Sequence, residues 1–224
     1  MKIFHGSKIK IENPQKKFGK LYNDYGQGFY TTQSFDLACE WATSDNSDGI
    51  VNEYDLDISN LKILKLDKSY NILNWLAILL DNRTIQYKTE LSKQACDFIK
   101  EKFLINYKDY DVIIGYRADD SYFSFSNDFV NNEIPIQTLD ESMYLGALGL
   151  QVFVTNNGFN KIKYINCHKV YAEDHYIKYI NRDNLARENY RNQHINIKDS
   201  IYIVDILRED DNFDDKKIPR IRIE

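Results

Sequence analysis

The order of strand-like and helix-like segments constrains the fold of this chain most, because it lacks the regular strand–helix–strand rhythm of parallel α/β proteins. Short or alternating apolar runs predict strands at residues 2–4, 29–31, 50–56, 61–66, 111–115 and 150–155. Apolar spacing of three or four residues predicts a helix after Ser34 and others at residues 72–80, 91–103 and 171–193. This mixture indicates an α+β fold.

Local signals in the first half of the chain set the limits of several elements. The triplet His5-Gly6-Ser7 is expected to break the first strand, and Ser34 is expected to cap the first helix. Residues 72–80 are apolar on nearly every side, so we expect a buried helix there.

The second half of the chain carries fewer signals. Thr138-Leu-Asp-Glu141 fits a capping box, which predicts the start of a helix that Gly146 and Gly149 would close. Residues 201–207 are apolar and predict a final strand or helix, and the acidic run from Glu209 predicts a solvated or disordered tail.

The length of 224 residues fits one large domain, or a domain with a substantial extension. The sequence has no internal repeat, low-complexity tract or linker, so one compact unit is expected. Within it we expect a main domain at residues 1–164. A C-terminal helical extension with an acidic tail would follow at residues 165–224, packed on the same unit.

Charge and cysteine content exclude several classes of protein. A net charge of −5 provides no global basic field for a passive nucleic-acid coat. Cys39, Cys96 and Cys167 are widely spaced and lack zinc-site spacing, which suits reduced thiols and predicts no metal site. The N-terminus lacks a signal-peptide apolar region, and the longest apolar stretch, residues 75–80, is too short to span a bilayer. We therefore expect a soluble cytoplasmic protein.

Three segments near the N-terminus combine residue types that suit a ligand site. They are Phe4–Ser7, Tyr25–Thr32 and Ser34–Ala42. Each alone has a structural explanation, such as a loop glycine or an aromatic residue in the core. Their order and spacing together resemble the poly-ADP-ribose polymerase branch of the ADP-ribosyltransferases. That superfamily has His-Gly-[Ser/Thr] on a first strand, then Gly-x-Gly-[Ile/Phe/Val]-Tyr, then a helix that carries a second aromatic residue.

The wider chain resembles DUF3990, a bacterial family within that superfamily, from about Lys2 to Tyr164. The residues that carry this resemblance are Asp111–Asp120 and Leu148–Gln151. It implies a split core of mixed and antiparallel β-sheet flanked by helices, and NAD as the substrate.

The resemblance also implies roles for individual residues. His5 would bind a ribose hydroxyl of NAD, and Gly6 would offer its backbone to the carboxamide, where a Cβ would crowd the ring. Tyr30 would stack on the nicotinamide, with Trp41 a candidate for the opposite face. Further contacts with NAD would come from Ser7, Gly28 and Thr32.

The third motif departs from the better-known enzymes of the superfamily. Where those enzymes usually have a glutamate at the start of a late strand, this chain has Gln151. Glutamine can hydrogen-bond a ribose hydroxyl but cannot act as a general base. A carboxylate from elsewhere could substitute, and Asp120 or its neighbour Asp119 is the first choice; a helix cap with a first-turn acid is the alternative. Otherwise the acceptor needs no strong base, or NAD is bound without turnover.

We therefore expect an ADP-ribosyltransferase that moves ADP-ribose from NAD to a protein or nucleic acid and releases nicotinamide. By analogy it would be a toxin of a toxin–antitoxin or phage-defence system, with an inhibitory antitoxin protein as partner. Three alternatives stay open. The chain could be a non-catalytic module that binds NAD or ADP-ribose, an NAD glycohydrolase, or a structural or interaction protein without a ligand.

Overall fold

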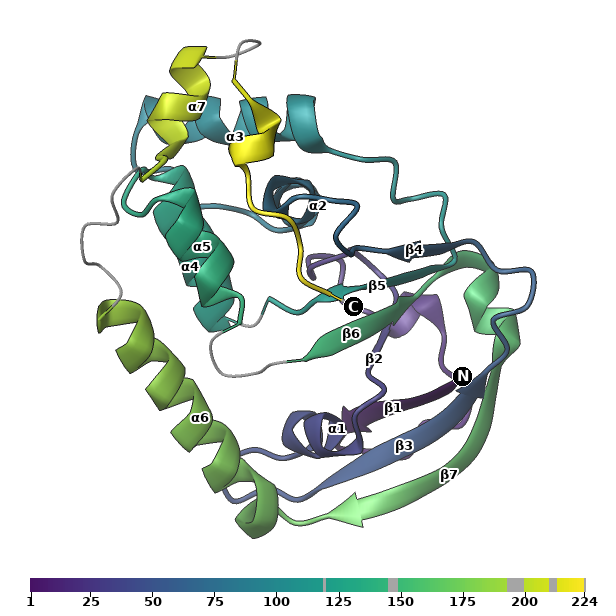
Figure 1. The fold of residues 1–224 in the computed structure, drawn as a ribbon. Coiled ribbons are helices and arrows are strands. Elements are labelled where there is room, and N and C mark those ends of the chain that lie inside the picture. The colour runs from purple at the N-terminus through teal and green to yellow at the C-terminus, as the bar shows by residue number, and fades with distance from the viewer. Residues whose placement is uncertain (119, 145–148, 193–199, 210–212, 224) are drawn as a thin grey trace.

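A computed structural model describes residues 1–118, 120–144, 149–192, 200–209 and 213–223, with the backbone alone at 120–122 and 192. The strands form two sheets (Figure 1). One is antiparallel, in the order β1-β3-β7, and consists of β1 (Lys2–Ser7), β3 (Gly49–Leu56) and β7 (Ile162–Val170). The other is mixed, in the order β2-β6-β5-β4, and consists of β2 (Phe29–Thr31), β6 (Leu150–Val154), β5 (Val112–Tyr116) and β4 (Ile63–Lys65). The prediction of an α+β fold is confirmed.

The two sheets meet where β1 passes the end of β2. Phe4 and Thr32 exchange two backbone hydrogen bonds of 2.7 and 2.9 Å across this junction. The prediction that His5-Gly6-Ser7 breaks the first strand was wrong, because these residues continue the antiparallel pairing with β3 as far as Ser7. Apolar side chains from both sheets, including Ile3 and Val152, form a buried cluster between them.

Helix α1 (Phe35–Ala42) lies directly on the antiparallel sheet. Ser34 caps it as predicted, since its hydroxyl accepts a hydrogen bond of 3.2 Å from the Leu37 amide. A Cβ at Gly6 of β1 would lie 2.1 Å from the Ala38 carbonyl, and one at Gly49 of β3 would lie 2.0 Å from the Ala42 carbonyl. The glycines therefore allow the helix backbone to touch the strands.

Helix α2 (Ile72–Asn82) is the centre of the larger core, as its apolar sequence predicts. Leu76 and Ile78 are fully buried, and Asn71 caps the helix through a capping box. Helix α3 (Glu90–Phe103) packs against it, and in Figure 1 α2 lies between α3 and the mixed sheet.

The capping box predicted at Thr138 was wrong. Helix α5 (Ile136–Ser142) starts three residues earlier, with Pro135 in place of Thr138 at the N-cap, and Thr138 is buried in its first turn. A tertiary contact sets this start, because the Ile136 amide donates a hydrogen bond of 2.8 Å to the Ile201 carbonyl. Gly146 lies outside the described residues. Helix α4 (Asp120–Val130) precedes α5.

The C-terminal part of the chain returns to the core. Helix α6 (Ala172–Asn192) follows β7, and α7 (Ile203–Glu209) shows that residues 201–207 are mainly helical. Within the predicted tail, residues 213–223 are described, and Ile218, Ile221 and Ile223 are buried against the larger core. The predicted domain limit at residue 164 falls inside β7, which pairs with β3 along its length. Among the described helices, none combines the length and apolar character that crossing a bilayer requires.

The contact of α1 with β1 makes Gly6→Ala a test of packing. The added methyl group would meet helix backbone that no rotamer change can relieve, so we expect a loss of about 1–3 kcal/mol in the free energy of unfolding. Lys2→Ala, at an exposed position of the same strand, should change it by less than about 1 kcal/mol. Urea denaturation measures both, and equal stability of Gly6→Ala and wild type would contradict the packing explanation.

Candidate functional site

A cavity of about 630 Å³ opens at the split between the two sheets. His5 and Gly6 come from β1, Tyr30 from β2, Trp41 from α1 and Gln151 from β6, so the structure brings together five of the residues predicted from sequence. The other described residues that line it are Lys20, Asn23, Asp24, Arg83, Arg117, Ala118, Tyr179 and Arg187. The volume lies within the range typical of small-molecule sites.

His5 joins the two sheets through its side chain. Its Nδ1 lies 2.7 Å from the Tyr30 carbonyl oxygen, and because a carbonyl can only accept, Nδ1 must carry a proton. Burial lowers the pKa of His5, and the hydrogen bond to Tyr30 opposes this only in part. The ring is therefore neutral at pH 7, and its unprotonated Nε2 has no hydrogen-bond partner among the described residues. His5 thus offers the cavity a hydrogen-bond acceptor.

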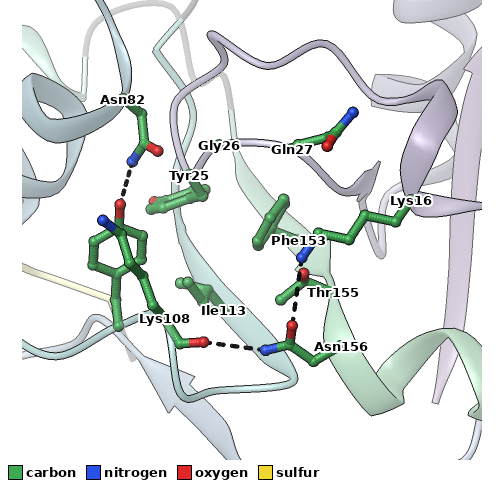
Figure 2. A pocket seen from close by; sticks show the side chains of 11 residues that line it. Lys16, Tyr25, Gly26, Gln27, Asn82, Lys108, Ile113, Phe153, Thr155 and Asn156 are labelled. Carbon is green, nitrogen blue, oxygen red and sulfur yellow. Dashed lines mark hydrogen bonds between the residues drawn. The ribbon is translucent and has the colours of Figure 1, made fainter.

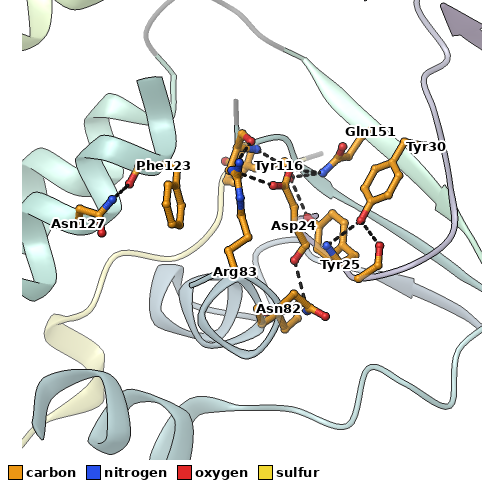
Figure 3. Close-up of polar contacts among 12 residues, drawn as sticks. Asp24, Tyr25, Tyr30, Asn82, Arg83, Tyr116, Phe123, Asn127 and Gln151 are labelled. Carbon is orange, nitrogen blue, oxygen red and sulfur yellow. Dashed lines mark hydrogen bonds and ion pairs between the residues drawn. The ribbon is translucent and has the colours of Figure 1, made fainter. Parts of the chain in front are cut away.

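Tyr30 presents its ring rather than its hydroxyl. The hydroxyl donates to the Gly26 carbonyl at 2.7 Å and accepts from the Tyr25 amide at 3.0 Å (Figure 3). Burial raises the pKa of Tyr30, so the phenol stays protonated. The ring lies 4.9 Å from Phe153, measured between centroids. A hydroxyl that already has two partners leaves the aromatic face as the part available for a ligand.

Four predicted residues have structural roles that need no ligand. Gly6 lines the cavity, but the atoms a Cβ would meet belong to α1, while at Gly28 a Cβ would lie 2.3 Å from the Phe153 ring. The Ser7 hydroxyl donates to the Ile9 carbonyl at 2.5 Å and accepts from Asn52 at 3.0 Å. Thr32 is buried, and its hydroxyl accepts a hydrogen bond of 3.1 Å from the Ser34 amide. None of Ser7, Gly28 and Thr32 is among the described residues that line this cavity.

Trp41 and Arg117 form a pair on the wall of the cavity. The Arg117 guanidinium lies over the indole, 5.0 Å from the ring centroid, so it occupies one face of the ring that was predicted to stack on nicotinamide. Both side chains also hold a buried donor, Trp41 Nε1 and Arg117 Nη1, that has no hydrogen-bond partner among the residues that the structure describes. Buried donors without partners are rare in folded proteins, and these two are placed to donate to an acceptor in the cavity.

Asp24 is the carboxylate beside Gln151, and the sequence analysis missed it. Its Oδ2 accepts hydrogen bonds from the Ala118 amide at 2.9 Å and from Gln151 Nε2 at 3.0 Å, and its Oδ1 lies 3.3 Å from Arg83 Nη1 (Figure 3). Burial raises the pKa of Asp24, and these three partners and Arg117 oppose the rise. The only signal in the sequence is that Asp24 directly precedes the glycine-containing segment of the second motif.

The two aspartates expected to replace the missing glutamate cannot be compared with Asp24. Asp119 lies outside the described residues, and Asp120 is described only through its backbone, as the first residue of α4. Their assignment stays a prediction. Among the described carboxylates, Asp24 is the one that forms a hydrogen bond with Gln151. The two residues are 127 positions apart in the sequence.

The charge of the cavity is opposite to that of the whole chain. Among the described residues that line it, Lys20, Arg83, Arg117 and Arg187 stand against the single carboxylate of Asp24, whereas the net charge of the protein is −5. Arg83 and Arg187 already have acidic partners, Asp24 and Asp183. A wall of this composition suits an anionic ligand.

Two further cavities lie next to this part of the fold. One, of about 620 Å³, shares His5, Lys20, Asn23 and Tyr30 with the first and is otherwise lined largely by residues 9–19. The other, of about 340 Å³, includes Tyr25, Asn82, Phe153 and Asn156 and contains none of the predicted site residues (Figure 2). In the part of the chain that the structure describes, no group of three or more His, Cys, Asp or Glu side chains could hold a metal ion.

Comparison with known families gives one match, to the family described as protein of unknown function (DUF3990), over residues 1–164. The chain belongs to the DUF3990 family. No curated protein matches it, and no solved structure matches it. The DUF3990 segment contains all the described cavity residues except Tyr179 and Arg187, which come from α6. The resemblance of the sequence to DUF3990 is thus confirmed, and the family description states neither a superfamily nor an activity.

The neutral state of His5 predicts a pH dependence of stability. The folded protein resists protonation of this ring, whereas the unfolded chain protonates it with a pKa of about 6.5. The contribution of neutral His5 to the free energy of unfolding is therefore fully present above that pH. It is lost as the pH falls towards the lower pKa that His5 has in the folded protein. Each pH unit by which folding lowers the pKa is worth about 1.4 kcal/mol.

The matched variant is His5→Asn, whose amide can still donate to the Tyr30 carbonyl but does not titrate. We expect its free energy of unfolding to fall less than that of the wild type between pH 7 and pH 5, measured by urea denaturation. The other histidines are common to both proteins, so their contributions cancel in the difference. Parallel pH profiles would show that His5 is not held neutral.

Proposed function

We propose that this protein is an ADP-ribosyltransferase that takes NAD as its substrate, and that its two sheets are the split core of that superfamily. The observation that carries the proposal is the convergence of His5, Gly6, Tyr30, Trp41 and Gln151 on one cavity. These residues were singled out by their resemblance to NAD-binding motifs, and they come from four separate elements of the fold. A chance resemblance in sequence would give no reason for them to meet.

The chemistry of the cavity fits the parts of NAD. The free Nε2 of His5 can accept a hydrogen bond from a ribose hydroxyl, and the ring of Tyr30 can pack against an aromatic base. The unpartnered donors of Arg117 and Trp41 suit the oxygens of the diphosphate, which carries negative charge.

In the proposed reaction, the bond between nicotinamide and its ribose breaks and its electron pair leaves with nicotinamide. A nucleophilic atom of the acceptor bonds to the same ribose carbon and loses its proton. The transition state is oxocarbenium-like, so positioning of the ribose contributes much of the rate. The acceptor is a protein or a nucleic acid, and an inhibitory antitoxin partner belongs to the same proposal.

A module that binds NAD or ADP-ribose without turnover is the second candidate, and Gln151 favours it. Glutamine cannot remove a proton, and the neighbouring Asp24 carboxylate is already engaged by three donors. An NAD glycohydrolase is a variant of the first candidate, in which water replaces the acceptor.

Release of nicotinamide from NAD tests the main proposal. The purified protein is assayed with and without cell lysate, and His5→Ala should abolish release because the ribose contact is lost. Release that needs lysate supports a transferase, and release without it supports a glycohydrolase or self-modification. Binding of NAD without any release would contradict the transferase and favour the binding module.

Affinity for ADP-ribose tests the role of the unpartnered donors. Arg117→Gln should weaken binding by about tenfold to a hundredfold, the effect of losing a hydrogen bond to a charged group. Trp41→Phe keeps an aromatic ring and removes one donor, so it should cost about tenfold or less. Arg208→Gln, an equal loss of charge on the exposed surface of α7, is the control for titration calorimetry. Equal affinities of all four proteins would exclude a contact with the diphosphate.

A further inference from the structure

The side-chain amide of Gln151 is held in one orientation. Its Nε2 donates to Asp24 Oδ2 at 3.0 Å and to the Tyr116 carbonyl at 3.2 Å, which uses both hydrogens of the nitrogen. Turning the amide over would place its oxygen against a carboxylate and a carbonyl, with no hydrogen between them. The orientation therefore follows from the partners. Gln151 Oε1 is left without a hydrogen-bond partner among the described residues.

Asp24 is itself fixed from three sides. The Ala118 amide after β5, Gln151 on β6 and Arg83 after α2 all donate to its carboxylate. Its backbone carbonyl also accepts a hydrogen bond of 3.4 Å from Asn82 at the end of α2. Asp24 is only 7% exposed, so water has little access to replace these partners. Asp24 is a rigid acceptor beside a side chain of the cavity wall.

We infer that Asp24 is a positioning residue that fixes the Gln151 amide so that Oε1 serves the cavity as a hydrogen-bond acceptor for a ligand hydroxyl. Tyr116 contributes a second acceptor, but its carbonyl is shared with Tyr25 Oη at 2.8 Å and Trp75 Nε1 at 3.4 Å. Asp24 is therefore the main determinant of the amide orientation. That the hydroxyl belongs to a ribose rests on the proposed function.

The hold of Asp24 on the amide can be measured without a ligand. NMR follows the exchange of the two Gln151 side-chain amide protons with solvent, assigned by their loss in Gln151→Met. Asp24→Ala removes the acceptor and should speed exchange by about tenfold, the equivalent of one hydrogen bond. Asp24→Asn keeps an oxygen for Ala118 and Gln151 and should stay within about threefold of the wild type. Exchange in Asp24→Ala that is as slow as in the wild type would overturn the inference.

Affinity for ADP-ribose tests the consequence for binding. Asp24→Ala and Gln151→Met should each weaken binding by about tenfold, and the double variant should be no weaker than either, because both changes remove one contact. Ser142→Ala is the control for a general loss of stability: it loses a buried hydrogen bond of 2.7 Å to the Leu139 carbonyl in α5, and no hydrogen bond connects it to Asp24 or Gln151. It should keep wild-type affinity.

The outcomes separate this inference from the proposed function. Additive losses in the double variant, or Asp24→Asn binding as weakly as Asp24→Ala, would overturn the positioning role. If Asp24→Ala does not fold, the comparison of Asp24→Asn with Gln151→Met makes the same test. A wild-type protein that does not bind ADP-ribose would refute the NAD proposal, and the exchange measurement would still decide whether Asp24 fixes the amide.

Discussion

The structure depends on a single point of contact between the backbones of β1 and the end of β2. The pair of hydrogen bonds between Phe4 and Thr32 joins the two sheets, and the next residue, His5, adds a side-chain bond to the Tyr30 carbonyl. Beyond this point the sheets diverge, and the gap between them is the cavity. A continuous sheet would have no such opening, because ladder hydrogen bonds would occupy the edges of both strands. The same contact therefore joins the two sheets and marks where the cavity between them begins.

Two kinds of polar residue surround this opening, and they differ in how far the protein itself satisfies them. Tyr30, Asp24 and the nitrogen of Gln151 have their hydrogen-bonding capacity taken up by backbone and neighbouring side chains. His5 Nε2, Gln151 Oε1, Trp41 Nε1 and Arg117 Nη1 have no partner in the described structure. The first group forms a rigid frame, and the second provides two acceptors and two donors around one space. That pattern matches a ligand with hydroxyl and anionic oxygen groups.

The local sequence pattern correctly predicted helices whose apolar spacing or cap residues are unambiguous. It failed where a contact with a distant part of the chain determines the structure. Helix α2 follows from its apolar sequence, and α1 follows from Ser34 and the spacing of its apolar residues. The start of α5 could not be found locally, because Ile201 sets it from 65 positions away. Asp24 was missed for the same reason, since nothing near it in the sequence shows that it meets Gln151. The motif residues Ser7 and Thr32 are close in sequence to Gly6 and Tyr30, which line the cavity, yet their own side chains form local hydrogen bonds.

The course of β7 has a consequence for any shortened form of the protein. The family match ends at residue 164, but β7 continues to Val170 and pairs with β3 as far as Gly49. A fragment that ended with the match would expose the backbone amides and carbonyls of β3 along most of one side. Unprotected strand edges of this kind pair with one another and cause aggregation. The boundary of sequence similarity is therefore not a boundary of foldability, and a fragment cut there would lose its solubility before its chemistry could be assayed.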